Sequence, residues 1–481
     1  MEGLKEKTVR GISWSLAEQF GLQGLRLVIG IVLARILTPA DYGLVGMIAV
    51  FFAVAQVFID GGFSISYIQK KEVTTEDANT VFYTNLLTSI IVYVLFWFSA
   101  PLIARFYGQP QLVELTRVLS VVLIINSFNI IQVAQLTRDV NFRRKTTISL
   151  VATMGSGILG ILAALNGYGV WSLVIQQITG RLFSTAGFWI LARWKPGMSY
   201  SSASFRKMFS FGAWALAANL LRTLFDNIYT LTIGRVFSVA QVGYYTKAQQ
   251  FQLMASQSLI SAIGAVSFPV LSKLQADETQ MTAAMKKFMR STLFFIIPLM
   301  ITLLIVAKPF TLIFLTEKWA PIIPLLKLLC IVGILYPIHM VNVQALTAYG
   351  KIKQGFITEL IKNGMRIANI IVMSRYSVMH IVAGEVAVSS LSLFVNTVYI
   401  KKYFGYGLMK QMNDMKELIA GGVVSALTGL IATSLSSSLW MGLILGSVMV
   451  MTVFYLFQYV FNRNLFVELK SFARYYVRKH E

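Results

Sequence analysis

The sequence predicts an all-α membrane protein with about 14 transmembrane helices, arranged as two pseudo-symmetric six-helix lobes plus two extra C-terminal helices. Three observations predict this fold class: the composition, a row of long apolar segments and an internal repeat. Of the 481 residues, 56% are hydrophobic and only 13% are charged, whereas soluble domains carry about 25% charged residues. The chain is therefore expected to be a multi-pass membrane protein.

The apolar segments give the individual helices. A stretch of about 20 apolar residues is long enough to cross the hydrocarbon core of a bilayer as a helix. Such stretches lie at 12–37, 42–67, 79–102, 113–136, 146–165, 168–191, 208–233, 240–267, 288–307, 321–348, 354–374, 378–400, 416–436 and 439–461.

An ungapped repeat relates the start of the chain to a segment 200 residues later. Six of the 31 positions from Ser13 to Gly43 are identical in the two copies, against the roughly 2 or 3 expected from ordinary residue frequencies. The identical pairs are Trp14 and Trp214, Leu16 and Leu216, Ala17 and Ala217, Arg35 and Arg235, Ala40 and Ala240, and Gly43 and Gly243. Weak internal symmetry between two sets of membrane helices is typical of transporters.

The repeat also suggests the domain organisation. Residues 1–200 form an N-lobe of helices 1 to 6, residues 201–405 form a C-lobe of helices 7 to 12, and residues 406–481 hold helices 13 and 14 and a basic cytoplasmic tail. An even number of helices per lobe keeps both copies in the same orientation, so an axis along the membrane normal should relate them. A substrate cavity is expected between the lobes.

Loop charges predict the topology, because cytoplasmic loops carry an excess of Lys and Arg. With the N-terminus inside, the inner segments hold 28 cations and the outer segments hold six. Both termini are therefore expected in the cytoplasm. The net charge of +22 would in a soluble protein suggest nucleic-acid binding. Here the topology rule accounts for two thirds of the cations, so no nucleic-acid partner is expected.

Several function classes find no support in the sequence. The chain has one cysteine and three scattered histidines, so neither a metal site nor a cofactor is expected. His339, beside Pro337, is expected to be a hydrogen-bonded core histidine. No outer loop exceeds about 15 residues, which leaves no external catalytic domain. The expected protein is not an enzyme.

Charged residues inside the predicted helices indicate a binding cavity. Each charge near the bilayer centre costs at least about 2.5 to 3.5 kcal/mol, so it requires a partner or a hydrated cavity. The cations in helices outnumber the acids, which suits an anionic substrate, and guanidinium groups bind phosphate oxygens in forked pairs. The candidate substrate-binding residues are Arg26, Asp60, Arg222, Asp226, Lys247 and Arg366.

Alternatives remain for most of these residues. Arg222 is able to pair with Asp226 at i,i+4 and also to contact substrate, and Arg366 is able to pair with a neighbouring helix. Arg26 and Lys247 have no acid at i±3 or i±4, which favours substrate contact. Asp60 precedes two glycines that loosen the helix, so it either exposes backbone to the cavity or caps a helix break.

The residues also resemble a known family. The segments Leu33 to Gly43, Asp60 to Gln69 and Gly243 to Gln249 are similar to the polysaccharide flippases of the Wzx type, especially the colanic acid exporter branch. These flippases belong to a superfamily with the multidrug and toxin extruders and the lipid II flippase. The resemblance implies two six-helix lobes that rock to move an undecaprenyl-diphosphate-linked oligosaccharide from the inner to the outer leaflet of the bacterial inner membrane.

The resemblance also implies partners and site residues. In the lipid II flippase, cations on helices 1 and 8 hold the diphosphate, and Arg26 and Lys247 occupy those helices here. Membrane lipids, a polysaccharide polymerase and export machinery are the implied partners. Transport is driven either by an H⁺ or Na⁺ gradient or by downstream consumption of the product. The alternative function is a cation-coupled multidrug antiporter of the same superfamily, whose cavity should be acidic.

Overall fold

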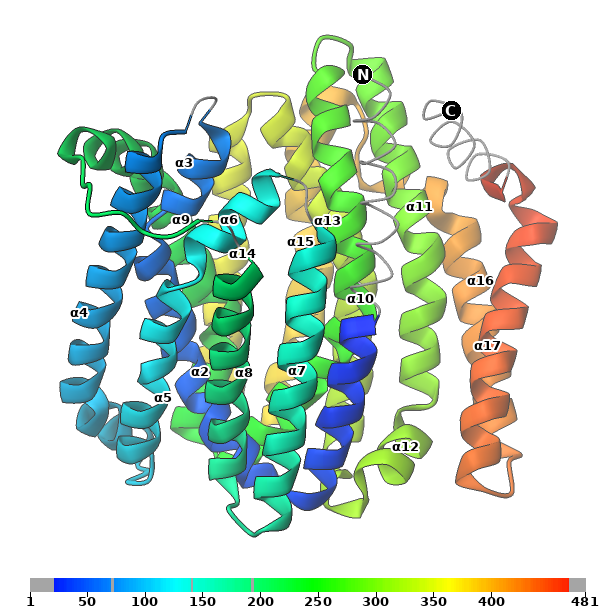
Figure 1. Cartoon of the computed structure of the whole chain (residues 1–481). Coiled ribbons are helices and arrows are strands. Elements are labelled where there is room, and N and C mark those ends of the chain that lie inside the picture. Colours follow the sequence, from blue (N-terminus) through cyan, green and yellow to red (C-terminus); the bar gives the residue numbers. More distant parts are fainter. Residues whose placement is uncertain (1–20, 71–72, 140–141, 192–193, 467–481) are drawn as a thin grey trace. The chain divides into compact units, whose positions relative to one another are not determined.

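The computed structural model describes residues 21–70, 73–139, 142–191 and 194–466, and within these ranges the regular structure is helical, with no strand (Figure 1). Trp14, the start of the first predicted helix and most of the basic tail lie outside the described residues. The elements are a helix over 21–36, α2 (Pro39–Asp60), α3 (Phe63–Gln69), α4 (Thr75–Tyr107), α5 (Leu112–Ser127), α6 (Ile130–Arg138), α7 (Phe142–Leu165), α8 (Val170–Leu191), α9 (Ser202–Val236), α10 (Val239–Lys273), α11 (Glu278–Ile305), α12 (Ala307–Phe310), a π-helical turn (Thr311–Leu315), a 3₁₀ turn (Glu317–Trp319), α13 (Ile322–Ala348), α14 (Ile352–Met373), α15 (Val378–Phe404), α16 (Leu408–Ser434) and α17 (Leu439–Phe461).

The described helices include nine that are long and apolar enough to cross a membrane, or ten if the bent pair α5 and α6 forms one span. The chain is therefore a multi-pass α-helical membrane protein. Helices α8 and α9 are of similar length but carry polar and charged residues, including Arg181, Arg222 and Asp226, which lower their apolar character. Such residues normally face the interior of a helix bundle.

The chain divides into two compact units, residues 1–243 and 244–481. In the first unit α2 packs on α9, α4 on α5 and α7 on α8. In the second unit α11 packs on α13 and α16, and the two C-terminal helices α16 and α17 lie side by side (Figure 1). The core of the second unit includes Met285, Ile297, Leu418 and Phe454, all buried.

The repeat has a direct structural counterpart. In both copies a helix ends at position 36 or 236, two residues break it, and a new helix begins at position 39 or 239. The same capping bond closes both first helices, from the Leu37 amide to the Leu33 carbonyl at 2.8 Å and from the Phe237 amide to the Ile233 carbonyl at 2.9 Å. The two copies of the repeat thus share the same local structure, a helix, a two-residue break and a second helix.

The two repeat-related glycines also contact each other's helices within the first unit. A β-carbon on Gly43 would lie 1.9 Å from the Val239 carbonyl oxygen, and one on Gly243 would lie 1.9 Å from the Pro39 carbonyl oxygen. The contact is reciprocal, as expected where two copies of one motif meet. Only glycine permits so close an approach of two backbones.

One correction concerns the predicted segment 42–67, which is not one helix. It divides into α2 and α3 at Gly61 and Gly62, whose φ angles of +53° and +74° are left-handed. Asp60 accepts a hydrogen bond from the Ser64 hydroxyl across this break. The helix break that the sequence analysis considered for Asp60 is therefore present. The Asp60 carboxylate links the end of α2 to the start of α3.

A second correction concerns the predicted segment 113–136, which divides into α5 and α6 with a bend of 42°. No glycine or proline marks this break. Backbone groups freed inside a membrane need partners, and α8 supplies them. The Thr185 hydroxyl donates to the Ile125 carbonyl at 3.1 Å, and the Trp189 indole N–H donates to the Phe128 carbonyl at 2.9 Å.

Candidate functional site

A polar cavity of about 780 Å³ lies inside the first unit. Its volume is in the range of sites that hold medium-sized organic ligands. The helices that line it are α2, α3, α5, α6, α7, α8 and α9, so both broken segments contribute to its wall. The charged lining residues are Asp60, Lys145, Arg181, Arg222 and Asp226.

Side chains from three helices form a chain of hydrogen bonds along one wall of this cavity. The Arg181 guanidinium on α8 donates to the Asn126 Oδ1 on α5 at 3.4 Å. The Asn126 amide in turn donates to the Gln56 Oε1 on α2 at 2.9 Å. These bonds orient the Arg181 side chain within the cavity and leave the rest of its guanidinium donors for a ligand.

Arg222 and Asp226 form the predicted pair on α9, with 3.5 Å between Arg222 Nε and Asp226 Oδ2. Both side chains remain more than half exposed, at 71% and 56%. An exposed pair of this kind contributes little to stability. The pair therefore presents a cation and a carboxylate to the cavity and is not required for folding. Its predicted role in binding substrate stays a prediction.

Arg26 lies on the helix over 21–36 and is exposed. Its charge acts on Arg181, so the two cations are near each other in the first unit. Like charges repel, so an anion bound beside both guanidinium groups would relieve this repulsion.

The other two predicted site residues belong to the second unit. Lys247 on α10 is 2% exposed, with its ammonium 5.6 Å from the centre of the Phe251 ring. Arg366 on α14 donates to the Asn363 Oδ1 at 3.2 Å, and its charge acts on Glu385 of α15. Their contact with substrate stays a prediction.

Two other residues of the second unit, Lys362 and His339, have structural roles. Lys362 pairs with Glu359 at 2.6 Å, so this buried cation has a same-helix counter-ion. His339 is 8% exposed and contacts Ser389 at 3.2 Å and Asn396 at 2.6 Å. The prediction of a hydrogen-bonded core histidine is confirmed.

The chemistry of the cavity suits an anionic ligand with hydroxyl groups. Three cations face two carboxylates in its lining, and amides and hydroxyls complete the polar wall. Guanidinium groups suit phosphate oxygens, while amides donate and accept and thus match hydroxyl groups. Among the described residues, no group of three or more His, Cys, Asp or Glu side chains could hold a metal ion.

Sequence reasoning left Arg181 out of the candidate site, although it placed this cation inside a helix. Arg181 has no acid at i±3 or i±4, the same signal that selected Arg26 and Lys247. Gln56 and Asn126 carried no signal, because a single amide in an apolar helix is indistinguishable from one that serves helix packing.

A bundle of apolar helices around a cationic cavity defines a membrane protein of the transporter type. The chain belongs to the polysaccharide biosynthesis protein family, whose profile matches residues 32–324. The resemblance predicted from the sequence is confirmed.

Relatives of known assignment are similar over about two thirds of their length. The lipopolysaccharide biosynthesis protein WzxC of Escherichia coli (strain K12) is 28% identical over 69% of this chain and 68% of its own. The succinoglycan biosynthesis transport protein ExoT of Rhizobium meliloti (strain 1021) is 26% identical over 69% and 67%. The teichuronic acid biosynthesis protein TuaB of Bacillus subtilis (strain 168) is 26% identical over 74% of each.

Solved structures show the same fold. The lipid II flippase MurJ in an inward closed conformation matches with a TM-score of 0.74 and 16% identity, over 94% of this chain and 99% of its own. An inward-facing multidrug resistance transporter of the MATE family matches with a TM-score of 0.63 and 16% identity, over 83% and 99%. The fold is therefore shared by transporters of glycan lipids and of drugs, and the site has to distinguish them.

Proposed function

We propose that this protein is a flippase that moves an undecaprenyl-diphosphate-linked oligosaccharide from the inner to the outer leaflet of the bacterial inner membrane for polysaccharide export. The cationic cavity of the first unit is the observation that carries the proposal. A lipid diphosphate bears charge that does not cross hydrocarbon unaided. Arg181, Arg222 and Arg26 offer guanidinium groups to the diphosphate, and the amides of the wall offer hydrogen bonds to the sugar.

The relatives support the same substrate class. Their names assign three of them to the biosynthesis or transport of lipopolysaccharide, succinoglycan and teichuronic acid. A multidrug antiporter would need an acidic cavity for organic cations, and the excess of cations in the lining disfavours that function.

The mechanism we propose is alternating access without covalent chemistry. Lipid-linked glycan enters from the inner leaflet, the cations replace the hydration of the diphosphate, and the lipid tail stays in the bilayer. Lys247 and Arg366 assist Arg26, Arg222, Asp226 and Asp60 during the passage. The driving force is either an H⁺ or Na⁺ gradient or the consumption of the product by a polymerase and export machinery.

The proposed membrane arrangement has fourteen spans, two six-helix lobes over 1–200 and 201–405, and two further helices in 406–481. Every predicted segment overlaps at least one helix of the described ranges, which supports the count. The excess of cations on one side of the predicted helices supports cytoplasmic termini.

Depletion of the protein tests the proposed function in cells. We expect the lipid-linked repeat unit to accumulate on the inner leaflet while the surface polysaccharide disappears, because synthesis continues and transport stops. The measurement is mass spectrometry of extracted glycolipids, with leaflet accessibility followed in spheroplasts. Unchanged glycolipid pools, together with a gain in sensitivity to organic cations, would instead assign the protein to drug export.

A further inference from the structure

A second, smaller pocket lies in the first unit, on the other side of α6 from the main cavity. Its volume is about 510 Å³. Helix α6 separates the two spaces: Ala134 and Thr137 line the main cavity, whereas Gln132 and Gln135 line the pocket. Helix α6 follows the 42° bend after α5 and presents different faces to the two spaces.

Gln132 is the unusual residue of this pocket. It is 0% exposed, and neither its amide nitrogen nor its amide oxygen has a hydrogen-bond partner. The indole N–H of Trp194, which lines the same pocket, also has none. Buried polar groups in native proteins almost always have partners. Within the protein, the Gln132 amide and the Trp194 indole N–H thus have no hydrogen-bond partner.

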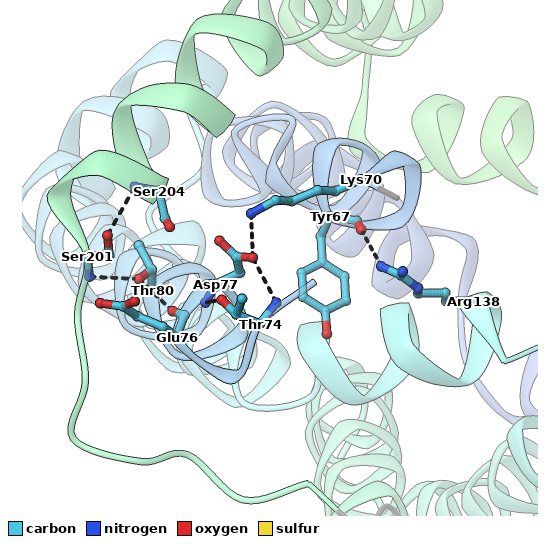
Figure 2. A network of polar contacts seen from close by, with 9 residues as sticks. All are labelled: Tyr67, Lys70, Thr74, Glu76, Asp77, Thr80, Arg138, Ser201 and Ser204. Carbon is cyan, nitrogen blue, oxygen red and sulfur yellow. Dashed lines mark hydrogen bonds and ion pairs between the residues drawn. The ribbon is translucent and has the colours of Figure 1, made fainter. Parts of the chain in front are cut away.

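The surrounding wall is fixed by contacts of its own (Figure 2). The Gln135 amide donates to the Tyr67 hydroxyl at 3.3 Å, and Arg138 donates to the Tyr67 carbonyl at 3.4 Å. Next to them Lys70 pairs with the buried carboxylate of Asp77 at 2.5 Å. These contacts hold α3, α4 and α6 together, so the pocket is preorganised, while Gln132 and the Trp194 indole N–H are left without a partner.

We infer that this pocket binds a sugar residue of the transported glycan. The inference rests on the proposed function. A sugar ring carries neighbouring hydroxyls that donate and accept, which matches the two atoms of the Gln132 amide, and its apolar C–H face matches Tyr67, Leu136 and Leu191. A free phosphate accepts hydrogen bonds, so the unpartnered Gln132 oxygen would face it unfavourably. A lipid tail would leave every polar atom of the pocket unpaired.

The pocket has the charge and the position for this role. Arg138 and Arg144 outnumber Asp139 in its lining, which accommodates an acidic sugar. In the proposed topology, which rests on the loop charges, this end of the helices lies at the cytoplasmic side, where the lipid-linked glycan is exposed before transport. The sugar is recognised in this pocket before the diphosphate binds in the main cavity. Helix α6 lies between the two sites.

The test measures retention of two radiolabelled probes on the purified full-length protein, immobilised on beads in detergent. One probe is the radiolabelled oligosaccharide released by mild acid from the lipid-linked glycan of the producing cells; the other is undecaprenyl diphosphate without sugar. We expect Gln132→Leu to weaken oligosaccharide binding at least about tenfold, and Trp194→Phe to weaken it about threefold, through the lost hydrogen bonds. Binding of undecaprenyl diphosphate should not change.

Thermal unfolding provides the control for folding. Gln132→Leu should unfold no earlier than the wild type, because it removes unpaired polar atoms and keeps the volume. Gln411→Leu is the matched variant: Gln411 is also 0% exposed, but it exchanges two hydrogen bonds with Asn342, at 3.2 and 3.0 Å. It should unfold earlier and bind the oligosaccharide normally.

Equal oligosaccharide binding by the wild type and Gln132→Leu would overturn the inference. The pocket would then hold only water. The inference would also be overturned if inorganic phosphate displaced the oligosaccharide from the wild type and Gln132→Leu abolished this displacement. A wild type that binds undecaprenyl diphosphate but not the oligosaccharide would reject this pocket alone. A wild type that binds neither probe would reject the proposed function itself.

Discussion

Arg181→Gln is expected to lower glycan export by about 10- to 150-fold at equal membrane abundance. The variant removes a charge-assisted contact with the diphosphate, and such contacts contribute about 1.5 to 3 kcal/mol. Arg222→Gln should have a similar effect, because its pair with Asp226 is exposed and still presents the guanidinium to the cavity. Arg181→Lys should recover part of the export, since it keeps the charge but loses the forked geometry. Surface polysaccharide per cell is the readout.

Arg117→Ala is the matched control for these variants. Arg117 lies on α5 with its guanidinium 4.8 Å from the centre of the Trp97 ring, and it does not line the cavity. Export should stay at the wild-type level. The same assay decides the roles of Arg26 and Lys247 through Arg26→Ala and Lys247→Ala. Wild-type export by both Arg181→Gln and Arg222→Gln would remove the cavity from the mechanism.

Gly43→Leu and Gly243→Leu are each expected to destabilise the protein by about 3 kcal/mol or more. A β-carbon at either site would lie 1.9 Å from a backbone oxygen of the facing helix, so the backbones would have to separate, and overpacking of this kind costs about 1 to 3 kcal/mol even for smaller additions. The alanine variants should be milder. The unfolding temperature of the purified protein gives the measurement.

The double variant Gly43→Ala with Gly243→Ala adds a sharper test. Both glycines lie at one crossing, so a helix displaced by the first alanine should leave little cost for the second, and the two effects should not add. Gly364→Ala is the control: no atom lies within 4 Å of its β-carbon position on α14, and alanine favours helix by up to about 1 kcal/mol. Wild-type unfolding temperatures in both leucine variants would contradict the close contact.

The helix segments were predictable because apolar length is a local property. The sequence identified Gly43 and Gly243 as equivalent positions of the repeat, but it did not predict that they contact each other's helices. The break at Phe128 and Asn129 was not predictable from the sequence. It depends on hydrogen bonds from Thr185 and Trp189, which lie on a helix about 60 residues away. Long-range partners of this kind leave no mark in the broken segment itself.

The candidate site shows the same division. Charge in an apolar helix identified Arg222, Asp226 and Asp60, and the structure brings these three to one cavity. Gln132 was not predicted, because its missing hydrogen-bond partner is a property of the folded structure and not of the sequence. Arg181 could have been chosen by the rule that chose Arg26.

Transport in proteoliposomes tests the central claim most directly. The purified protein is reconstituted with lipid-linked oligosaccharide carrying a fluorescent sugar, and a membrane-impermeant quencher reports which leaflet holds the glycan. We expect the wild type to expose inner-leaflet glycan to the quencher, and the double variant Arg181→Gln with Arg222→Gln to do so at least about tenfold more slowly. Exposure by the wild type no faster than in protein-free liposomes, with or without an H⁺ or Na⁺ gradient, would contradict a flippase.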